Sequence, residues 1–284
     1  MRVNLDEWRY GLLRRRSKAT VELYISRVRN FLTWLGNRPL NAQSVDSYLT
    51  HLMKEGKHKN TIYIYFETIK MLFRWMGREK ELEVVEPPRF ERDVYENQDF
   101  LTDDEVIKLI NGIKNERDRA LVTLMIDTGL RRNEVSSLNV GDVNLRDGTI
   151  TVRRSKRRGR PRVEEVSIRS NLTKELLRVH ISSKKQQSIN TPLFTNRRGE
   201  RLTPNGIYYI VRRYGLGILG KPLHPHTLRH TAGSQIVRAT GSVKLVAEHL
   251  GITPQVAENY SHISRSEVRK LLPDIMPNMK EVIT

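Results

Sequence analysis

Apolar residues in the first ninety positions recur every three or four residues, which is the spacing of one face of an α-helix. Three stretches show this spacing: 21–35, 45–52 and 62–76. Ser17 and Asn60 stand close to the start of the two long stretches, where a polar side chain can cap the first free N–H groups. The pattern predicts a small helical bundle over residues 1–90, with basic residues at its helix starts.

The apolar pattern stops at a polar stretch that follows Pro87 and Pro88. It resumes after Leu101, where Thr102 and Glu105 have the spacing of a helix capping box. We therefore expect a helical domain at 1–90, a linker at 91–98 and a second domain at 99–284, with the boundary near residue 97.

One part of the second domain alternates like a β-strand. Asp147-Gly148 is a turn signal, residues 149–152 alternate in polarity, and residues 163–168 can return antiparallel to them. The tip between these segments, 153–162, is dense in Arg and Lys and has no acidic residue. A second short β segment is expected near residues 192–194. The fold class predicted is mainly α with a small β-hairpin, in which a helical bundle precedes an α+β domain.

The charge balance points to a polyanionic partner. Lys and Arg total 50 against 32 Asp and Glu, which gives a net charge of +18 and a pI of about 10.2. Such an excess favours nucleic acid, because cations that neutralise phosphates release counterions; a basic surface without such a partner is the alternative. The absence of cysteine excludes disulfides, Cys-ligated zinc and a cysteine nucleophile. The apolar runs are too short to span a bilayer, so we expect a cytoplasmic, nucleoid-associated protein without a membrane partner.

Four segments of the second domain carry residues suited to phosphodiester chemistry. Arg131 follows Thr-Gly-Leu and precedes Glu134, Lys156 lies in the basic hairpin tip, Arg229 lies within 226–230 (His-Thr-Leu-Arg-His), and Tyr260 follows further on. Guanidinium groups bind phosphate oxygens bidentately and can stabilise the charge of the transition state. A phenol is a weak nucleophile and needs help to lose its proton. His226, three residues before Arg229 on one helix face, is the candidate for that proton.

These segments resemble the tyrosine recombinase (phage integrase) family, and in particular its compact Xer-type members. The Thr-Gly-Leu-Arg-x-x-Glu box matches 128–134, the His-x-Leu-Arg-His box matches 226–230, and Tyr-x-His matches Tyr260 and His262. The resemblance implies a site-specific recombinase that closes as a clamp on duplex DNA and cuts it through a 3′-phosphotyrosyl intermediate. It also implies a homo-tetramer on two DNA sites, neither a metal nor another cofactor, and a C-terminal segment that packs into a neighbouring subunit.

The resemblance assigns a role to each matching residue. Tyr260 is the nucleophile, Arg131 and Arg229 hold the phosphate, and Lys156 protonates the departing 5′ oxygen, with Arg154 or Arg157 as alternatives for that role. Supporting roles fall to Glu134, which orients an arginine or caps its helix, and to His230 and His249. The basic residues expected to contact DNA are Lys18, Lys59, Arg157, Arg158 and Arg160.

One position departs from the family pattern and keeps other interpretations open. The family usually has His or Trp directly after the Leu-Gly that precedes the tyrosine, whereas this chain has Ile252 after Leu250-Gly251. Either His249 supplies the missing imidazole or a contact without a hydrogen bond replaces it. Two rivals to a recombinase follow: a type IB topoisomerase-like enzyme, and a DNA-binding protein on the same scaffold that no longer cuts.

Overall fold

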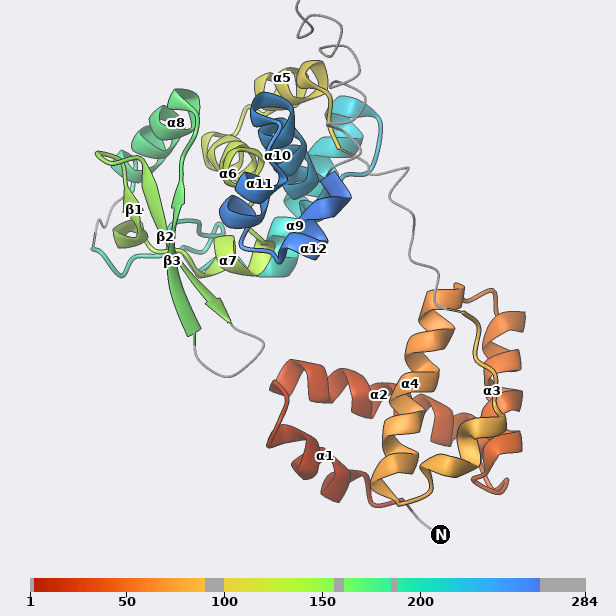
Figure 1. The fold of residues 1–284 in the computed structure, drawn as a ribbon. Coiled ribbons are helices and arrows are strands. Elements are labelled where there is room, and N and C mark those ends of the chain that lie inside the picture. The colour runs from red at the N-terminus through yellow and green to blue at the C-terminus, as the bar shows by residue number, and fades with distance from the viewer. Residues whose placement is uncertain (1–2, 90–99, 156–160, 185–187, 261–284) are drawn as a thin grey trace, which may run out of the picture. The chain divides into compact units, whose positions relative to one another are not determined.

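The computed structural model describes residues 3–89, 100–155, 161–184 and 188–260. The chain divides into two compact units, Met1–Glu96 and Asn97–Thr284 (Figure 1). The division falls inside the stretch expected to be a linker, and that stretch itself lies outside the described residues. Each unit is considered by itself below.

The first unit is a helical bundle, as the apolar spacing predicts. Its elements are α1 (Leu5–Leu13), α2 (Lys18–Leu35), α3 (Ala42–Lys54), α4 (Lys59–Trp75) and the 3₁₀ turn η1 (Glu79–Val84). The apolar stripes of α2, α3 and α4 face one another and bury a shared core. Trp8 of α1, which the periodicity did not reveal, packs into a second cluster with Val21, Ile25 and Leu72.

The helix starts agree with one of the two predicted caps. Ser17 caps α2, and its Oγ accepts a hydrogen bond from the Thr20 N–H at 3.3 Å. The prediction for Asn60 is wrong, because α4 begins at Lys59 and Asn60 lies inside it. His58 is the N-cap instead, and its Nδ1 accepts from the Asn60 N–H at 3.2 Å. An imidazole nitrogen thus takes the place of the expected amide oxygen.

The second unit is mostly helical and contains one small sheet. Its helices are α5 (Asp103–Gly112), α6 (Glu116–Thr128), α7 (Arg132–Ser137), α8 (Asn171–Ser182), α9 (Pro204–Tyr214), α10 (Pro225–Thr240), α11 (Val243–Leu250) and α12 (Pro254–Ala257), and its short turns are η3 (Val140–Asp142), η4 (Gly215–Leu219) and η5 (Glu258–Tyr260). The predicted capping box is confirmed at α5, where Thr102 and Glu105 each accept the other's backbone N–H.

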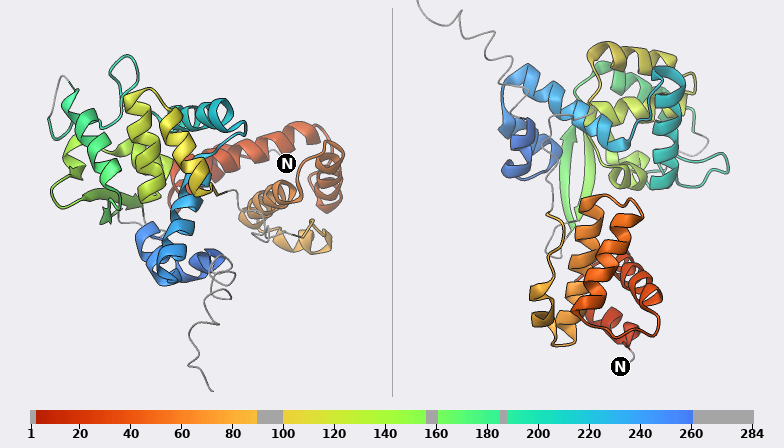
Figure 2. Two further views of the ribbon diagram at one scale, coloured as in Figure 1. Left: turned by 90° about the horizontal axis from the view of Figure 1, so that it is seen from above. Right: turned by 90° about the vertical axis from the view of Figure 1, so that its right-hand side faces the viewer.

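Helix α10 runs through the middle of this unit, in contact with α6, α9, α11 and η5 (Figures 1 and 2). Helix α6 is buried along its whole second half, from Ala120 to Thr128. A helix that is covered on every side is held by packing rather than by an amphipathic face. Helices α6 and α10 pack against each other, and the candidate site residues lie on α10 and in the segments next to these two helices.

The sheet has the order β1-β2-β3, with both pairs antiparallel. The predicted hairpin is confirmed as β2 (Thr149–Ser155) and β3 (Pro161–Ser167), whose strands lie side by side (Figure 2). The two-residue β1 (Val143–Asn144) joins β2 through a turn that includes Gly148 at φ +66°. The β segment expected near 192–194 is reduced to an isolated bridge between Asn139 and Pro192.

The inward face of β2 carries a charged residue at its far end. Alternate residues of a strand point to the same face, and here Ile150, Val152 and Arg154 are all buried. Arg153, between the last two, is exposed and pairs with Asp142. Arg154 thus points into the unit, whereas its neighbour Arg153 points outward.

Candidate active site

Arg131 stands at the N-terminus of α7 and is held by Glu134. Glu134 Oε2 accepts the Arg131 backbone N–H at 2.8 Å, and Glu134 Oε1 accepts from Arg131 Nη1 at 2.9 Å. Glu134 therefore both caps the helix and orients the arginine. The carboxylate is buried, whereas the Arg131 side chain is about half exposed. This guanidinium is positioned and remains open to a ligand.

Arg229, on α10, is 5% exposed and bridges two other elements. Its Nη1 donates to the carbonyl of Gly129 at 2.6 Å, and its Nη2 donates to the carbonyl of Leu250 at 2.7 Å. Gly129 ends α6 in the left-handed conformation, and Leu250 is the last residue of α11. A guanidinium has five N–H donors, so three remain once these two carbonyls are bound.

The surroundings of Arg229 hold several charges close together. Burial, followed by the positive charge of Arg131, lowers the pKa of Arg229 from its usual value to about 10. Glu134 acts in the opposite direction. A buried cation with a second cation close to it forms a site that favours an anion.

Tyr260 and two histidines form the second part of the site. The Tyr260 Oη lies 3.0 Å from His230 Nδ1, within hydrogen-bond distance. The His230 ring stacks in parallel on the ring of His226, with 4.3 Å between centroids. Both histidines lie on α10, one turn apart, and Arg229 directly precedes His230. The phenol, the imidazoles and the buried arginine thus share one end of α10.

The Tyr260 ring packs closely against α10 at one position. A Cβ added to Gly233 would come within 2.4 Å of the Tyr260 ring, so only glycine permits this approach. The ring also joins an apolar cluster with Ala232, Val246 and Leu250, and Tyr260 is 3% exposed. The candidate nucleophile is therefore buried in this conformation.

Burial favours the neutral form of both histidines of the site. Burial is the main cause that lowers the pKa of His230 to about 4, and the charges of His226 and Arg229 add to it. Burial, followed by Arg229 and Arg131, lowers the pKa of His226 as well. In the tautomer that carries hydrogen on Nε2, His230 Nδ1 can accept a hydrogen bond from the phenol.

His249 and Ile252 occupy the region where the family pattern is broken. His249, on α11, has its Nε2 buried without a hydrogen-bond partner among the described residues. Burial, with Arg169 next, lowers its pKa to about 4. Ile252 is partly buried against the cluster that holds Tyr260. Ile252 thus contributes an apolar contact, and a role for His249 as the replacement imidazole stays a prediction.

The depressed pKa values predict a loss of stability in acid. His249 is neutral in the folded state down to about pH 4, whereas the unfolded chain binds a proton below about pH 6.5. The unfolded state therefore takes up more protons as pH falls from 6.5 to 4, and the free energy of unfolding decreases by at most about 1.4 kcal/mol per pH unit for this group.

The test of this prediction is His249→Asn, which removes the titrating group. Thermal unfolding is measured at pH 7 and pH 5 at constant ionic strength. The melting temperature should fall less in the variant than in the original chain. Parallel losses in the two proteins would contradict the assignment.

The other predicted residues lie at the surface or outside the described residues. Lys18 and Lys59 begin α2 and α4 in the first unit, and both are exposed. Lys156, Arg157, Arg158 and Arg160, with His262 and the C-terminal segment after it, lie outside the described residues.

Arg154 is a site residue that the sequence presented only as an alternative for the hairpin cation. It is 7% exposed, and its Nε lies 3.5 Å from Glu134 Oε1. Its Nη1 donates to Glu164 Oε2 on β3 at 2.8 Å. The signal for this placement was the two-residue period of β2, which puts Arg154 on the face of Ile150 and Val152.

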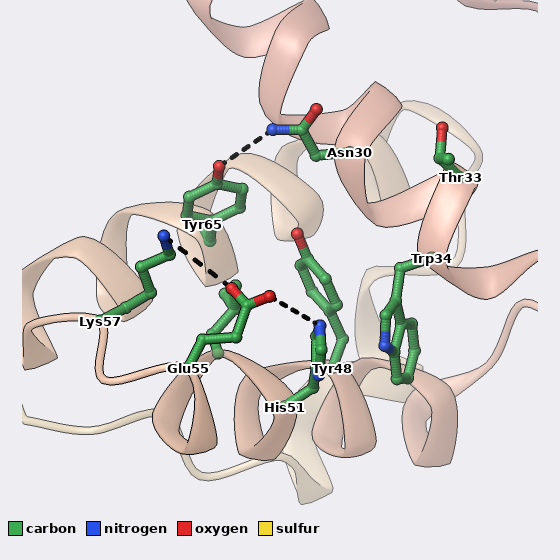
Figure 3. Close-up of a pocket in the computed structure, with 9 residues that line it drawn as sticks. Asn30, Thr33, Trp34, Tyr48, His51, Glu55, Lys57 and Tyr65 are labelled. Carbon is green, nitrogen blue, oxygen red and sulfur yellow. Dashed lines mark hydrogen bonds and ion pairs between the residues drawn. The ribbon is translucent and has the colours of Figure 1, made fainter.

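A pocket in the first unit has no part in this arrangement (Figure 3). Its polar groups pair with one another: Glu55 contacts His51 at 3.3 Å, and the Tyr65 hydroxyl accepts from Asn30 at 3.2 Å. Tyr48 is buried there, and burial raises the pKa of its phenol. The predicted catalytic residues all belong to the second unit.

Within the described ranges, no three His, Asp or Glu side chains come together as a metal site. No helix in those ranges is both long and apolar enough to cross a membrane.

Two family models match most of the chain. Residues 99–267 match the phage integrase family, and residues 8–82 match the phage integrase N-terminal SAM-like domain. The chain belongs to the phage integrase family. The resemblance inferred from the Arg, His and Tyr boxes is therefore confirmed, and so is the mainly helical fold with a small sheet.

Curated relatives in this family are tyrosine recombinases. Tyrosine recombinase XerA of Thermococcus kodakarensis is 30% identical over 259 residues, which cover 90% of this chain and 88% of the relative. Tyrosine recombinase XerD of Staphylococcus epidermidis is 29% identical over 254 residues, which cover 84% and 83%. This chain is accordingly a site-specific recombinase of the Xer-like kind, and the expectation of a DNA strand transferase is confirmed.

Solved structures share the fold at lower identity. A lambda integrase fragment, solved as a dimer bound to a core site, has a TM-score of 0.70 at 18% identity, covering 90% of this chain and 93% of that one. The crystal structure of XerA recombinase has a TM-score of 0.53 at 23% identity, covering 96% and 98%. These likenesses concern the fold.

Proposed function

We propose that Tyr260 cleaves one strand of duplex DNA by attack on a phosphodiester held between Arg131 and Arg229. The observation that carries the proposal is the hydrogen bond between Tyr260 Oη and the neutral His230, directly beside the buried Arg229. A phenol next to a proton acceptor and a preformed anion site has the three groups that phosphoryl transfer requires.

The two arginines stabilise the negative charge that develops on the phosphate oxygens. Attack on the diester adds negative charge to the non-bridging oxygens, and fixed guanidinium donors stabilise that charge without reorganising. Glu134 holds Arg131, and two backbone carbonyls hold Arg229, so both cations are oriented before DNA arrives.

The proposed reaction conserves bonds and protons. The Tyr260 oxygen forms a bond to phosphorus while the bond from phosphorus to the 5′ oxygen breaks. The stacked pair of His230 and His226 takes the phenol proton through the hydrogen bond between Tyr260 and His230. The departing 5′ oxygen receives a proton from Lys156, as the family resemblance implies. The product is a 3′-phosphotyrosyl linkage with a free 5′ hydroxyl, and attack by another 5′ hydroxyl reverses the step.

The proposed partner is double-stranded DNA with specific sites. The lambda integrase fragment and a XerH site-specific recombinase that share this fold were solved bound to DNA, and the net charge of +18 suits phosphate contacts. The finer proposals are a homo-tetramer on two sites, a clamp formed by the domains 1–90 and 99–284 around the linker, and DNA contacts by Lys18, Lys59, Arg157, Arg158 and Arg160. We place this activity in the cytoplasm, at the nucleoid.

The proposal is tested by covalent trapping on a random-sequence duplex library that carries a nick, so that the cleaved end is lost and the adduct accumulates. We expect a protein–DNA adduct stable to denaturant and an enriched sequence around the cut. A protein that binds the library without an adduct is the non-cutting scaffold. A protein that relaxes supercoils but never joins two sites acts as a topoisomerase.

A further inference from the structure

Arg154 is a buried cation whose position follows from the strand that carries it. It lies on the inward face of β2 with Ile150 and Val152, at the end where those apolar residues give way to charged ones. Placing a guanidinium there removes it from water, which is unfavourable unless carboxylates compensate for the charge.

Two carboxylates compensate for the charge of Arg154, and one of them belongs to the candidate active site. Glu164, on the paired strand, accepts from Arg154 Nη1 at 2.8 Å. Glu134 Oε1 lies 3.5 Å from Arg154 Nε, and the same oxygen accepts from Arg131 Nη1 at 2.9 Å. One buried carboxylate oxygen therefore lies between the two arginines.

The guanidinium is confined on its other side by the turn after α11. A Cβ added to Gly251 would lie 1.4 Å from Arg154 Nη1, and Gly251 has φ +60°, so only glycine is compatible with this contact. The preceding residue, Leu250, offers its carbonyl to Arg229. Arg154 therefore packs against the support of each candidate phosphate-binding arginine.

Arg154 is also incompletely satisfied, which a purely structural ion pair would avoid. Its buried Nη2 has no hydrogen-bond partner within the described part of the chain, and its buried Nε has only the 3.5 Å ion-pair contact with Glu134. Buried polar atoms without partners reduce stability and tend to occur where function requires them.

We infer that Arg154 is a positioning residue for Arg131 and acts through Glu134. The inference rests on the proposed cleavage reaction. Arg154 restricts the buried Glu134 carboxylate through their ion pair. Glu134 in turn sets the direction of the Arg131 guanidinium, which remains open to the phosphate. Without Arg154, Glu134 retains Arg131 but gains freedom to move with it, and a small displacement of an oriented group is costly for catalysis.

The experiment compares Arg154→Met with Arg153→Met, its outward-facing neighbour on the same strand. The rate of adduct formation is measured in single turnover at saturating DNA, on the site selected by the original chain, and DNA affinity is measured separately. We expect Arg154→Met to reduce the rate by about 10- to 100-fold with little change in affinity. Arg153→Met should cleave at close to the original rate.

A double-mutant cycle with Glu134→Gln distinguishes positioning from direct contact. If Arg154 acts through Glu134, its substitution should add little to the loss already caused by Glu134→Gln. Losses that multiply would mean that Arg154 acts independently of Glu134 and would overturn the inference. An unchanged rate in Arg154→Met would overturn it as well.

Two further results complete the test. If Arg154→Met fails to fold, as judged by circular dichroism, Arg154→Lys replaces it in the cycle, because a single ammonium cannot contact both carboxylates as the guanidinium does. Absence of an adduct with the original chain would overturn the proposed function and this inference together. An adduct with the original chain, at a rate unaffected by Arg154, would overturn the inference alone.

Discussion

Tyr260→Phe is expected to abolish the covalent adduct and leave DNA binding nearly unchanged. The substitution removes the attacking oxygen and its hydrogen bond to His230, while the ring keeps its seat against Gly233. Loss of one hydrogen bond changes the free energy of unfolding by only about 1 kcal/mol. Covalent trapping, affinity measurements and thermal unfolding on the same preparation check the three parts of this expectation.

The matched control for this variant is Tyr209→Phe. Tyr209 is exposed on α9 and should retain full adduct formation without its hydroxyl. If Tyr260→Phe still formed an adduct and Tyr209→Phe did not, the nucleophile would be Tyr209. Tyr214 is a weaker candidate, because its hydroxyl donates to the buried Asp118.

Arg229→Lys is expected to affect both the chemistry and the fold. Lysine keeps the charge but has no planar fork, so it cannot reproduce the bonds to the carbonyls of Gly129 and Leu250 and still face a phosphate. We expect adduct formation to slow by about 10²- to 10³-fold. The free energy of unfolding should fall by about 1–3 kcal/mol, because a buried carbonyl loses its partner.

Arg169→Lys separates the two effects. Arg169 also donates to backbone carbonyls, those of Asp127 and Ile126, but it belongs to neither the tyrosine nor the arginine group of the site. Its substitution should reduce stability and leave the cleavage rate close to that of the original chain. Equal losses of cleavage in Arg229→Lys and Arg169→Lys would assign the effect of Arg229 to folding alone.

Local signals in the sequence predicted most of the fold. Apolar residues at helical spacing located α2, α3 and α4, and the pair of Thr102 and Glu105 located the start of α5. These features depend on neighbours within one or two helical turns, so they can be predicted from the sequence. Strand β1 was missed because two residues are too few to show a period.

The contacts within the site were harder to predict from the sequence. The boxes identified Arg131, Arg229 and Tyr260, but the hydrogen bond of Tyr260 to His230, rather than to His226, depends on how η5 packs on α10. The link of Arg154 to Glu134 likewise joins a strand to a distant helix. Such contacts between remote segments have no periodic signature.

The burial of Tyr260, which is 3% exposed, bears on when cleavage can occur. Moving an aromatic ring of this size into water costs about 2 kcal/mol, so if attack on DNA requires an exposed ring, that form is roughly thirtyfold rarer than the buried one. A molecule that meets DNA by chance therefore leaves the strand intact in most encounters. Under that condition, cleavage requires a further interaction that offsets the difference in free energy.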